Sequence, residues 1–138
     1  MTYINKVYHE DCRDTIANLP DDSVDLVVTS PPYNVGKAYE ESFEDRPDFR
    51  VHSDMLVDIF NSCKRILKPN GRLCINVANI GRKPFVPLKD YITVGLVDAG
   101  WFMRGDIIWL KGPSARNTTA WGSYRMATSP FLLSLIHI

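Results

Sequence analysis

The sequence has no long apolar run and no paired cysteines, and each absence excludes a class of protein. No apolar stretch approaches the roughly 18 residues that span a bilayer, and the first six residues lack the apolar core of a signal peptide. The three cysteines show no C-x-x-C spacing and leave an odd thiol, so neither a disulfide scaffold nor a structural zinc site is expected. We therefore predict a soluble protein of the cytoplasm.

Histidine and net charge are also scarce. The three histidines show neither triad nor metal-ligand spacing, so the sequence gives little support to hydrolytic or zinc chemistry and predicts no metal site. Sixteen basic residues balance sixteen acidic ones over the whole chain. The balance hides an asymmetry, because residues 1–58 carry thirteen acids and five bases, whereas residues 59–138 carry three acids and eleven bases. The second part could therefore meet a polyanion.

Hydrophobic periodicity predicts alternating strands and helices in one domain of ordinary size. The run from Val24 to Thr29 is typical of a buried parallel strand, and residues 34–50 lack either period and are expected to form a loop. Such alternation favours an α/β fold with a mostly parallel sheet flanked by helices and with ligand sites at the carboxyl ends of the strands. The other expected strands are residues 4–8, 72–77 and 106–110, and the expected helices are residues 12–19, 53–67 (capped by Ser53) and 88–99.

The most informative segment is the corner at the end of the second expected strand, Ser30-Pro31-Pro32-Tyr33. It offers a hydroxyl acceptor, a carbonyl held between two proline rings and an aromatic face for stacking. These parts suit an exocyclic amine on a flat base, which is a poor nucleophile because its lone pair is delocalised. Two acceptors that hold the amine hydrogens out of the ring plane would restore that lone pair. A peptide-ligand role for the prolines is less favoured, because they directly follow a buried strand.

In this context S-P-P-Y after V-D-L-V-V-T resembles the catalytic motif of amino-methylating DNA methyltransferases, which modify N4 of cytosine or N6 of adenine. Further stretches resemble that family in the same order, and the match covers about residues 4–130. They are residues 9–12 with 19–21, the turn at 67–71, the strand at 107–111, and Asn117 with residues 119–123.

The resemblance implies a partial class I methyltransferase with a Rossmann-like sheet, double-stranded DNA as substrate and S-adenosylmethionine as cofactor. Ser at the first motif position leans toward N4 of cytosine over N6 of adenine, in an enzyme of restriction-modification or phage type. By the same resemblance, the catalytic residues are Ser30, Pro31, Pro32 and Tyr33, the cofactor contacts are Asp11, Cys12, Ser30 and Pro31, and the DNA contacts are Lys111, Arg116, Trp121, Ser123 and Arg125.

The chain departs from the family pattern in one respect, because it contains no F-x-G-x-G segment. The order with the catalytic motif first resembles the permuted members, in which the cofactor-binding half follows. We therefore expect residues 1–130 to be the catalytic part of a truncated domain and residues 131–138 to be a tail of separate origin. No membrane partner is expected, and a homodimer is among the assemblies that the resemblance allows.

Several residues leave a structural role open beside the functional one. Asp11 is as well explained by capping the first helix as by touching cofactor. Tyr39, Phe43 and Phe49 would either clamp DNA or rest on the surface, and the basic residues from Lys64 to Arg72 are better explained by the end of a helix than by phosphate. Two other functions stay open: a non-catalytic fragment with a DNA-facing surface, and methylation of another planar amine or amide in RNA or glutamine.

Overall fold

The computed structural model describes residues 3–34, 48–80, 85–110 and 128–136, which form three helices and four strands. The elements are α1 (Cys12–Asn18), β1 (Val24–Thr29), α2 (Phe49–Ile66), β2 (Leu67–Val77), α3 (Leu88–Asp98), β3 (Phe102–Leu110) and β4 (Thr128–Ile136). Within these ranges, helices and strands alternate until β3, as the periodicity predicts.

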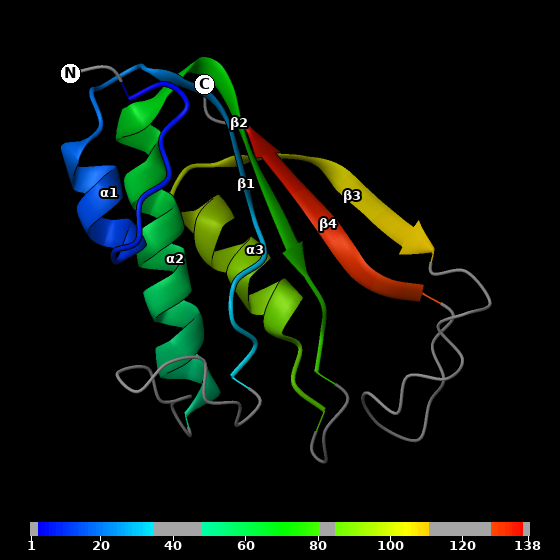
Figure 1. Cartoon of the computed structure of the whole chain (residues 1–138). Helices are drawn as coiled ribbons and strands as arrows, with labels where there is room; N and C mark the ends of the chain where they lie inside the picture. Colours follow the sequence, from blue (N-terminus) through cyan, green and yellow to red (C-terminus); the bar gives the residue numbers. More distant parts are fainter. Residues whose placement is uncertain (1–2, 35–47, 81–84, 111–127, 137–138) are drawn as a thin grey trace.

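The four strands form one sheet in the order β1-β2-β4-β3. β1 pairs with β2 in parallel, whereas β4 is antiparallel to both of its neighbours. It follows that β1, β2 and β3 run in one direction and β4 in the other, which Figure 1 shows as opposed arrows. The predicted α/β fold with a mostly parallel sheet is confirmed, and the carboxyl ends of β1 and β2 meet at one edge.

β4 was not expected from the sequence. Its residues 131–136 pair with residues 72–77 of β2, so the first six residues of the expected tail lie in the middle of the sheet. The separate origin of that tail stays a prediction. The sequence Thr128–Ile136 contains a proline at position 130, which argues locally against a central strand because proline lacks a backbone donor.

The helices cover one face of the sheet. Figure 1 shows α1, α2 and α3 grouped beside β1 and β2. The core between helices and sheet consists mainly of aliphatic side chains, and its members are Leu56, Phe60, Cys63, Ile66, Leu67, Leu73, Ile75, Val77, Ile80, Leu88, Ile92, Leu96 and Trp101. The prediction that β1 is buried on both faces is wrong for the described residues. Leu26 and Val28 are 51% and 64% exposed, because no described element covers the second face.

Three local expectations also need correction. Residues 4–8 form no strand, and Ile4 and Val7 are largely exposed there. α2 begins at Phe49, four residues before Ser53, because the Asp48 carboxylate accepts from the Arg50 amide and caps the helix. Ser53 instead lies buried inside the first turns of α2.

The turn from Lys68 to Gly71 interrupts the pairing of β1 with β2 without ending the strand. The register shifts there, since Val24 pairs with Leu67 and the next paired residue of β2 is Arg72. Asn70 has a φ of 65°, and a Cβ on Gly71 would stand 2.7 Å from the Lys68 carbonyl oxygen. Asn70 and Gly71 therefore fit a β-bulge, because asparagine tolerates the left-handed conformation and glycine has no Cβ to meet the carbonyl oxygen.

Candidate active site

The corner that follows β1 lies at the carboxyl edge of the sheet, where α/β proteins bind ligands. Thr29, the last residue of β1, pairs with Ile75 near the end of β2. Ser30 is exposed, Pro31 is buried, and Pro32 and Tyr33 are half-buried. The first proline of the corner is therefore packed inside the protein, while the serine is exposed to solvent.

The two acceptors proposed for the amine are available. Within the described part of the chain, neither the Ser30 hydroxyl nor the Pro31 carbonyl makes a hydrogen bond. An acceptor already used by a protein donor would have been a poor candidate for an incoming amine. The corner thus places an exposed hydroxyl beside a carbonyl that lies between two proline rings, and its role as an amine acceptor stays a prediction.

Tyr33 ties the corner to the neighbouring strand. Its hydroxyl donates to the backbone carbonyl of Asn76 at 3.4 Å, and its ring packs against the hydrophobic core. Asn34 follows with a φ of 57°, a left-handed conformation that asparagine tolerates better than most residues. Tyr33 therefore lies against the end of β2, and its proposed stacking role stays a prediction.

A buried histidine holds the second proline. His52, in the first turn of α2, is fully buried, and its Nε2 lies 2.8 Å from the carbonyl oxygen of Pro32. Because a carbonyl only accepts, the hydrogen of this bond belongs to Nε2. The Nδ1 atom is also buried and has no hydrogen-bond partner among the described residues. The histidine thus makes one directed contact to the corner.

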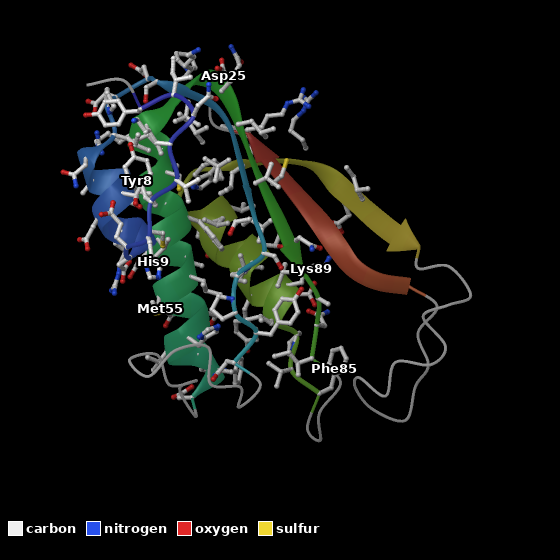
Figure 2. All side chains as sticks on the ribbon, in the orientation of Figure 1. Tyr8, His9, Asp25, Met55, Phe85 and Lys89 are labelled. Carbon is white, nitrogen blue, oxygen red and sulfur yellow. The ribbon has the colours of Figure 1, made fainter. Side chains whose placement is uncertain are left out.

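Polar residues also cluster just beyond β2. The Asn79 side chain accepts from the Lys89 backbone amide at 2.8 Å and donates to the Asp90 carboxylate at 2.9 Å, which satisfies the start of α3. Lys89 lies beside the carboxyl-terminal part of β2 in Figure 2 and pairs with Asp106 of β3 at 3.0 Å. Burial is the largest single effect and lowers the pKa of Lys89, but the hydrogen bonds and charges of Asp106 and Asp90 together outweigh it and hold the pKa above its ordinary value. This cluster fastens α3 to the sheet.

Of the two predicted cofactor contacts at the start of α1, Asp11 has a structural role. Asp11 caps α1 by accepting from the Arg13 amide at 2.8 Å, and its carboxylate also pairs with the Arg13 guanidinium at 2.6 Å. These contacts lower the pKa of Asp11 to about 2, the side-chain hydrogen bond to Arg13 being the largest cause. The neighbouring Cys12 is exposed. A cofactor contact by either residue stays a prediction.

The basic residues at the end of α2 bind groups of this chain. Lys64 donates to the Ala99 carbonyl, and Lys68 pairs with Asp25 at 2.8 Å, at the end of the molecule away from Lys89 (Figure 2). Arg65 donates to the carbonyls of Ile16, Ala17 and Leu19 at the end of α1 and pairs with Asp21. These contacts support the structural interpretation of the basic cluster over phosphate binding.

The predicted DNA contacts Lys111, Arg116, Trp121, Ser123 and Arg125 lie outside the described residues, as do Tyr39 and Phe43. Phe49, the third aromatic considered as a clamp, packs edge-on against Tyr91 with ring centroids 5.2 Å apart. In the residues that the structure places, no group of histidine, cysteine, aspartate or glutamate could hold a metal ion. None of the described helices is both long and apolar enough to cross a membrane.

Sequence reasoning missed His52 and Asn76. His52 shares its spacing with Leu56, Phe60 and Cys63, so it sits on the apolar face of α2, where a polar side chain needs a partner. A histidine on the apolar face of a helix indicates a structural or positioning role for that residue. Asn76 carries a buried Oδ1 with no partner among the described residues, but nothing in its strand sequence distinguishes it.

Comparison with known proteins adds independent evidence on the family of this chain. The model of the DNA methylase family that comprises N6 and N4 methyltransferases matches residues 24–130. The type II methyltransferase M.MjaVI of Methanocaldococcus jannaschii is 35% identical over 121 residues, which cover 85% of this chain and 60% of that protein. M.BglII of Bacillus subtilis is 32% identical over 111 residues, covering 79% of this chain and 30% of that protein.

Solved structures show the same fold. A protein of Thermus thermophilus, assigned to the DNA modification methylases, matches with a TM-score of 0.69 and 28% identity over 91% of this chain and 50% of its own. Its complex with S-adenosyl-L-methionine matches with a TM-score of 0.67. The chain thus spans 60% or less of the length of these relatives.

Proposed function

Because this chain belongs to the DNA methylase family of N6 and N4 methyltransferases, we propose that it takes part in methyl transfer from S-adenosylmethionine to the exocyclic amine of a DNA base. The observation that carries the proposal is the exposure and hydrogen bonding of the corner after β1. Ser30 is exposed, and neither its hydroxyl nor the Pro31 carbonyl has a partner within the described residues. This supports the proposal that both acceptors serve one NH2 group.

The residues of the corner would act by positioning. The Ser30 hydroxyl and the Pro31 carbonyl each accept one hydrogen of the amine, which turns its lone pair away from conjugation with the ring. The base must first leave the helix stack, and stacking on Tyr33 offsets part of that free energy. Neither prolyl residue can compete as a donor, because proline has no backbone N–H. No covalent intermediate with the protein is required.

S-adenosylmethionine supplies, when bound, a methyl group carried on a positively charged sulfur. The residues present fit such a ligand at two points. Ser30 and Pro31 stand at the carboxyl edge of β1, the region where class I folds bind cofactor. Asp11 is ionised at neutral pH because its pKa is about 2, and its carboxylate would accept from the hydroxyl groups of adenosine by giving up hydrogen bonds to Arg13. We propose Asp11, Cys12, Ser30 and Pro31 as the residues that would hold it.

The finer proposal is N4 of cytosine as the target, in a restriction-modification or phage system. It rests on Ser30, because serine at the first position of the motif leans toward N4-cytosine in this family. An amine of adenine would fit the same two acceptors. The basic second part of the chain, including Lys111, Arg116 and Arg125, is proposed to meet the DNA phosphates.

Tritiated S-adenosylmethionine and mixed duplex DNA test the proposal. We expect label in DNA with the wild-type chain and its loss with Tyr33→Ala, because the variant removes the stacking surface. Tyr91→Ala is the control for loss of a tyrosine ring, since Tyr91 is an exposed tyrosine of α3 that contacts Phe49 and Arg50 of α2. Label in RNA or in protein instead of DNA would point to a different amine or amide. Absence of both label and cofactor binding would support the non-catalytic fragment with a DNA-facing surface.

A further inference from the structure

Among the φ and ψ torsions of Pro31 and Pro32, the sequence leaves one free. The rings of Pro31 and Pro32 lock both φ angles, and ψ of Pro31 is restricted to extended values because a proline follows it. ψ of Pro32 has no such restriction, since Tyr33 follows. That torsion sets the plane of the Pro32–Tyr33 peptide and so the direction in which Tyr33 leaves the corner.

The contact that fixes this torsion comes from α2. The Nε2–H of His52 donates to the Pro32 carbonyl oxygen at 2.8 Å, from a ring that is fully buried. His52 itself is anchored, because its amide donates to the Asp48 carbonyl at 3.2 Å in the first turn of a helix that packs on the core. A rigid helix thus holds the one peptide plane that the two prolines do not determine.

A second contact holds the corner one residue further along the chain, at Tyr33. The Tyr33 hydroxyl reaches the Asn76 carbonyl at 3.4 Å, a longer and weaker bond than the one to Pro32. By itself it would hold the tip of the tyrosine but not the peptide that precedes it. The shorter contact from His52 acts directly on the peptide that precedes Tyr33.

We propose that His52 is a positioning residue, whose bond to the Pro32 carbonyl orients the Pro32–Tyr33 peptide and with it Tyr33. It touches neither base nor cofactor and acts through the corner. This inference rests on the proposed methyl transfer for its kinetic consequence. Its structural consequence, an ordered corner that depends on a donor at position 52, can be measured without any reaction.

Variants at position 52 distinguish the effect of the hydrogen-bond donor from the effect of the volume of the ring. The amide nitrogen of His52→Gln reaches about as far as Nε2 and can donate, whereas His52→Leu fills space without donating and His52→Asn is too short to reach Pro32. Ser53→Ala is the control, because Ser53 is equally buried in the same turn and its hydroxyl donates to the Arg50 carbonyl at 2.9 Å. Each variant is compared with the wild-type chain after its fold has been checked by thermal unfolding.

The kinetic arm measures kcat and the KM for S-adenosylmethionine separately. We expect His52→Leu to lower kcat by about ten- to a hundredfold, the effect of a misplaced positioning group, with little change in KM. His52→Gln should recover most of kcat, and Ser53→Ala should leave it unchanged. Equal kcat values for Gln and Leu, or a change confined to KM, would overturn the proposal.

The structural arm measures amide hydrogen exchange at Tyr33 and Asn34, with the β1 amides as an internal reference. Faster exchange at these two residues in His52→Leu, restored in His52→Gln, supports the positioning role. Unchanged exchange in both overturns it. If Leu unfolds the chain, the Gln and Asn pair makes the same comparison. If the wild-type chain transfers no methyl group, the proposed function fails, while the exchange comparison still decides the role of His52.

Discussion

The hydroxyl of Tyr33 donates to the backbone carbonyl of Asn76, and this bond joins the corner after β1 to the adjacent strand β2. The ring packs against the core beneath, so the residue proposed to stack on a base is also held by the protein. The ring and the hydroxyl therefore have separable roles. The ring would provide the stacking surface, and the hydroxyl would limit its movement.

Tyr33→Phe and Tyr33→Ala separate these roles. Phe keeps the ring and loses the hydroxyl that bonds to Asn76, so we expect a loss of about 0.5–1.5 kcal/mol in the free energy of unfolding and less than about a tenfold fall in methyl transfer. Ala should abolish measurable transfer. Chemical denaturation and label incorporation are measured on the same preparations. Equal transfer by Phe and Ala would show that the ring does not contribute.

Ser30→Ala tests the exposed acceptor. Because the hydroxyl makes no hydrogen bond within the described residues, we expect the free energy of unfolding to change by less than about 0.5 kcal/mol. Methyl transfer should nevertheless fall by about ten- to a thousandfold, the range for removal of one preorganised hydrogen-bonding group. Urea unfolding and initial rates give the two quantities. Stability that falls while transfer persists would assign Ser30 a structural role.

The Asp11 cap of α1 makes the free energy of unfolding depend on pH. Its pKa is about 2 in the folded chain and about 3.9 when unfolded, so the unfolded state binds the proton more tightly. Its stabilisation is therefore complete above the unfolded pKa and is lost as pH falls toward 2. Asp11→Ala should lower the free energy of unfolding by about 1 kcal/mol at pH 7, as for other helix caps. The difference from wild type, followed by denaturation from pH 7 to 3, should shrink below about pH 4. A constant difference would refute the ionised cap.

Gly95 tests the packing of α3 on α2. A Cβ at this position would stand 2.7 Å from Cγ2 of Val57, which is closer than real Cβ contacts. We expect Gly95→Ala to cost about 1–3 kcal/mol by overpacking, despite the better helix propensity of alanine. The double variant Gly95→Ala with Val57→Ala should recover part of this cost in a denaturation cycle. Additive effects of the two changes would show that the helices do not meet at this point.

The sequence predicts the fold class and the corner because both depend on local patterns. Val24–Thr29 and the two prolines after it specify a strand and a rigid end whatever surrounds them, and the family match over residues 24–130 confirms the resemblance. The same patterns could not reveal how many faces of β1 are covered. Burial depends on partners elsewhere in the chain, and Leu26 and Val28 are exposed although their residue types favour burial.

Long-range pairings account for what was missed. Residues 131–136 of β4 pair with residues 72–77, and no local signal encodes a partner that far away. The bond from His52 to Pro32 likewise joins residues 20 positions apart, so spacing rules for triads and metal sites do not detect it. The start of α2 was misplaced for a more local reason. Asp48 and Ser53 are both good caps, and the apolar face alone did not choose between them.

The most direct test identifies the atom that receives the methyl group. Duplex DNA is incubated with the chain and S-adenosylmethionine, digested to nucleosides and analysed by mass spectrometry. The account predicts N4-methyldeoxycytidine with the wild-type chain, or N6-methyldeoxyadenosine if only the base assignment is wrong, and neither product with folded Tyr33→Ala. Methylation at carbon 5 of cytosine, or the same amine product from wild type and Tyr33→Ala, would contradict an amine held at the Ser30–Tyr33 corner.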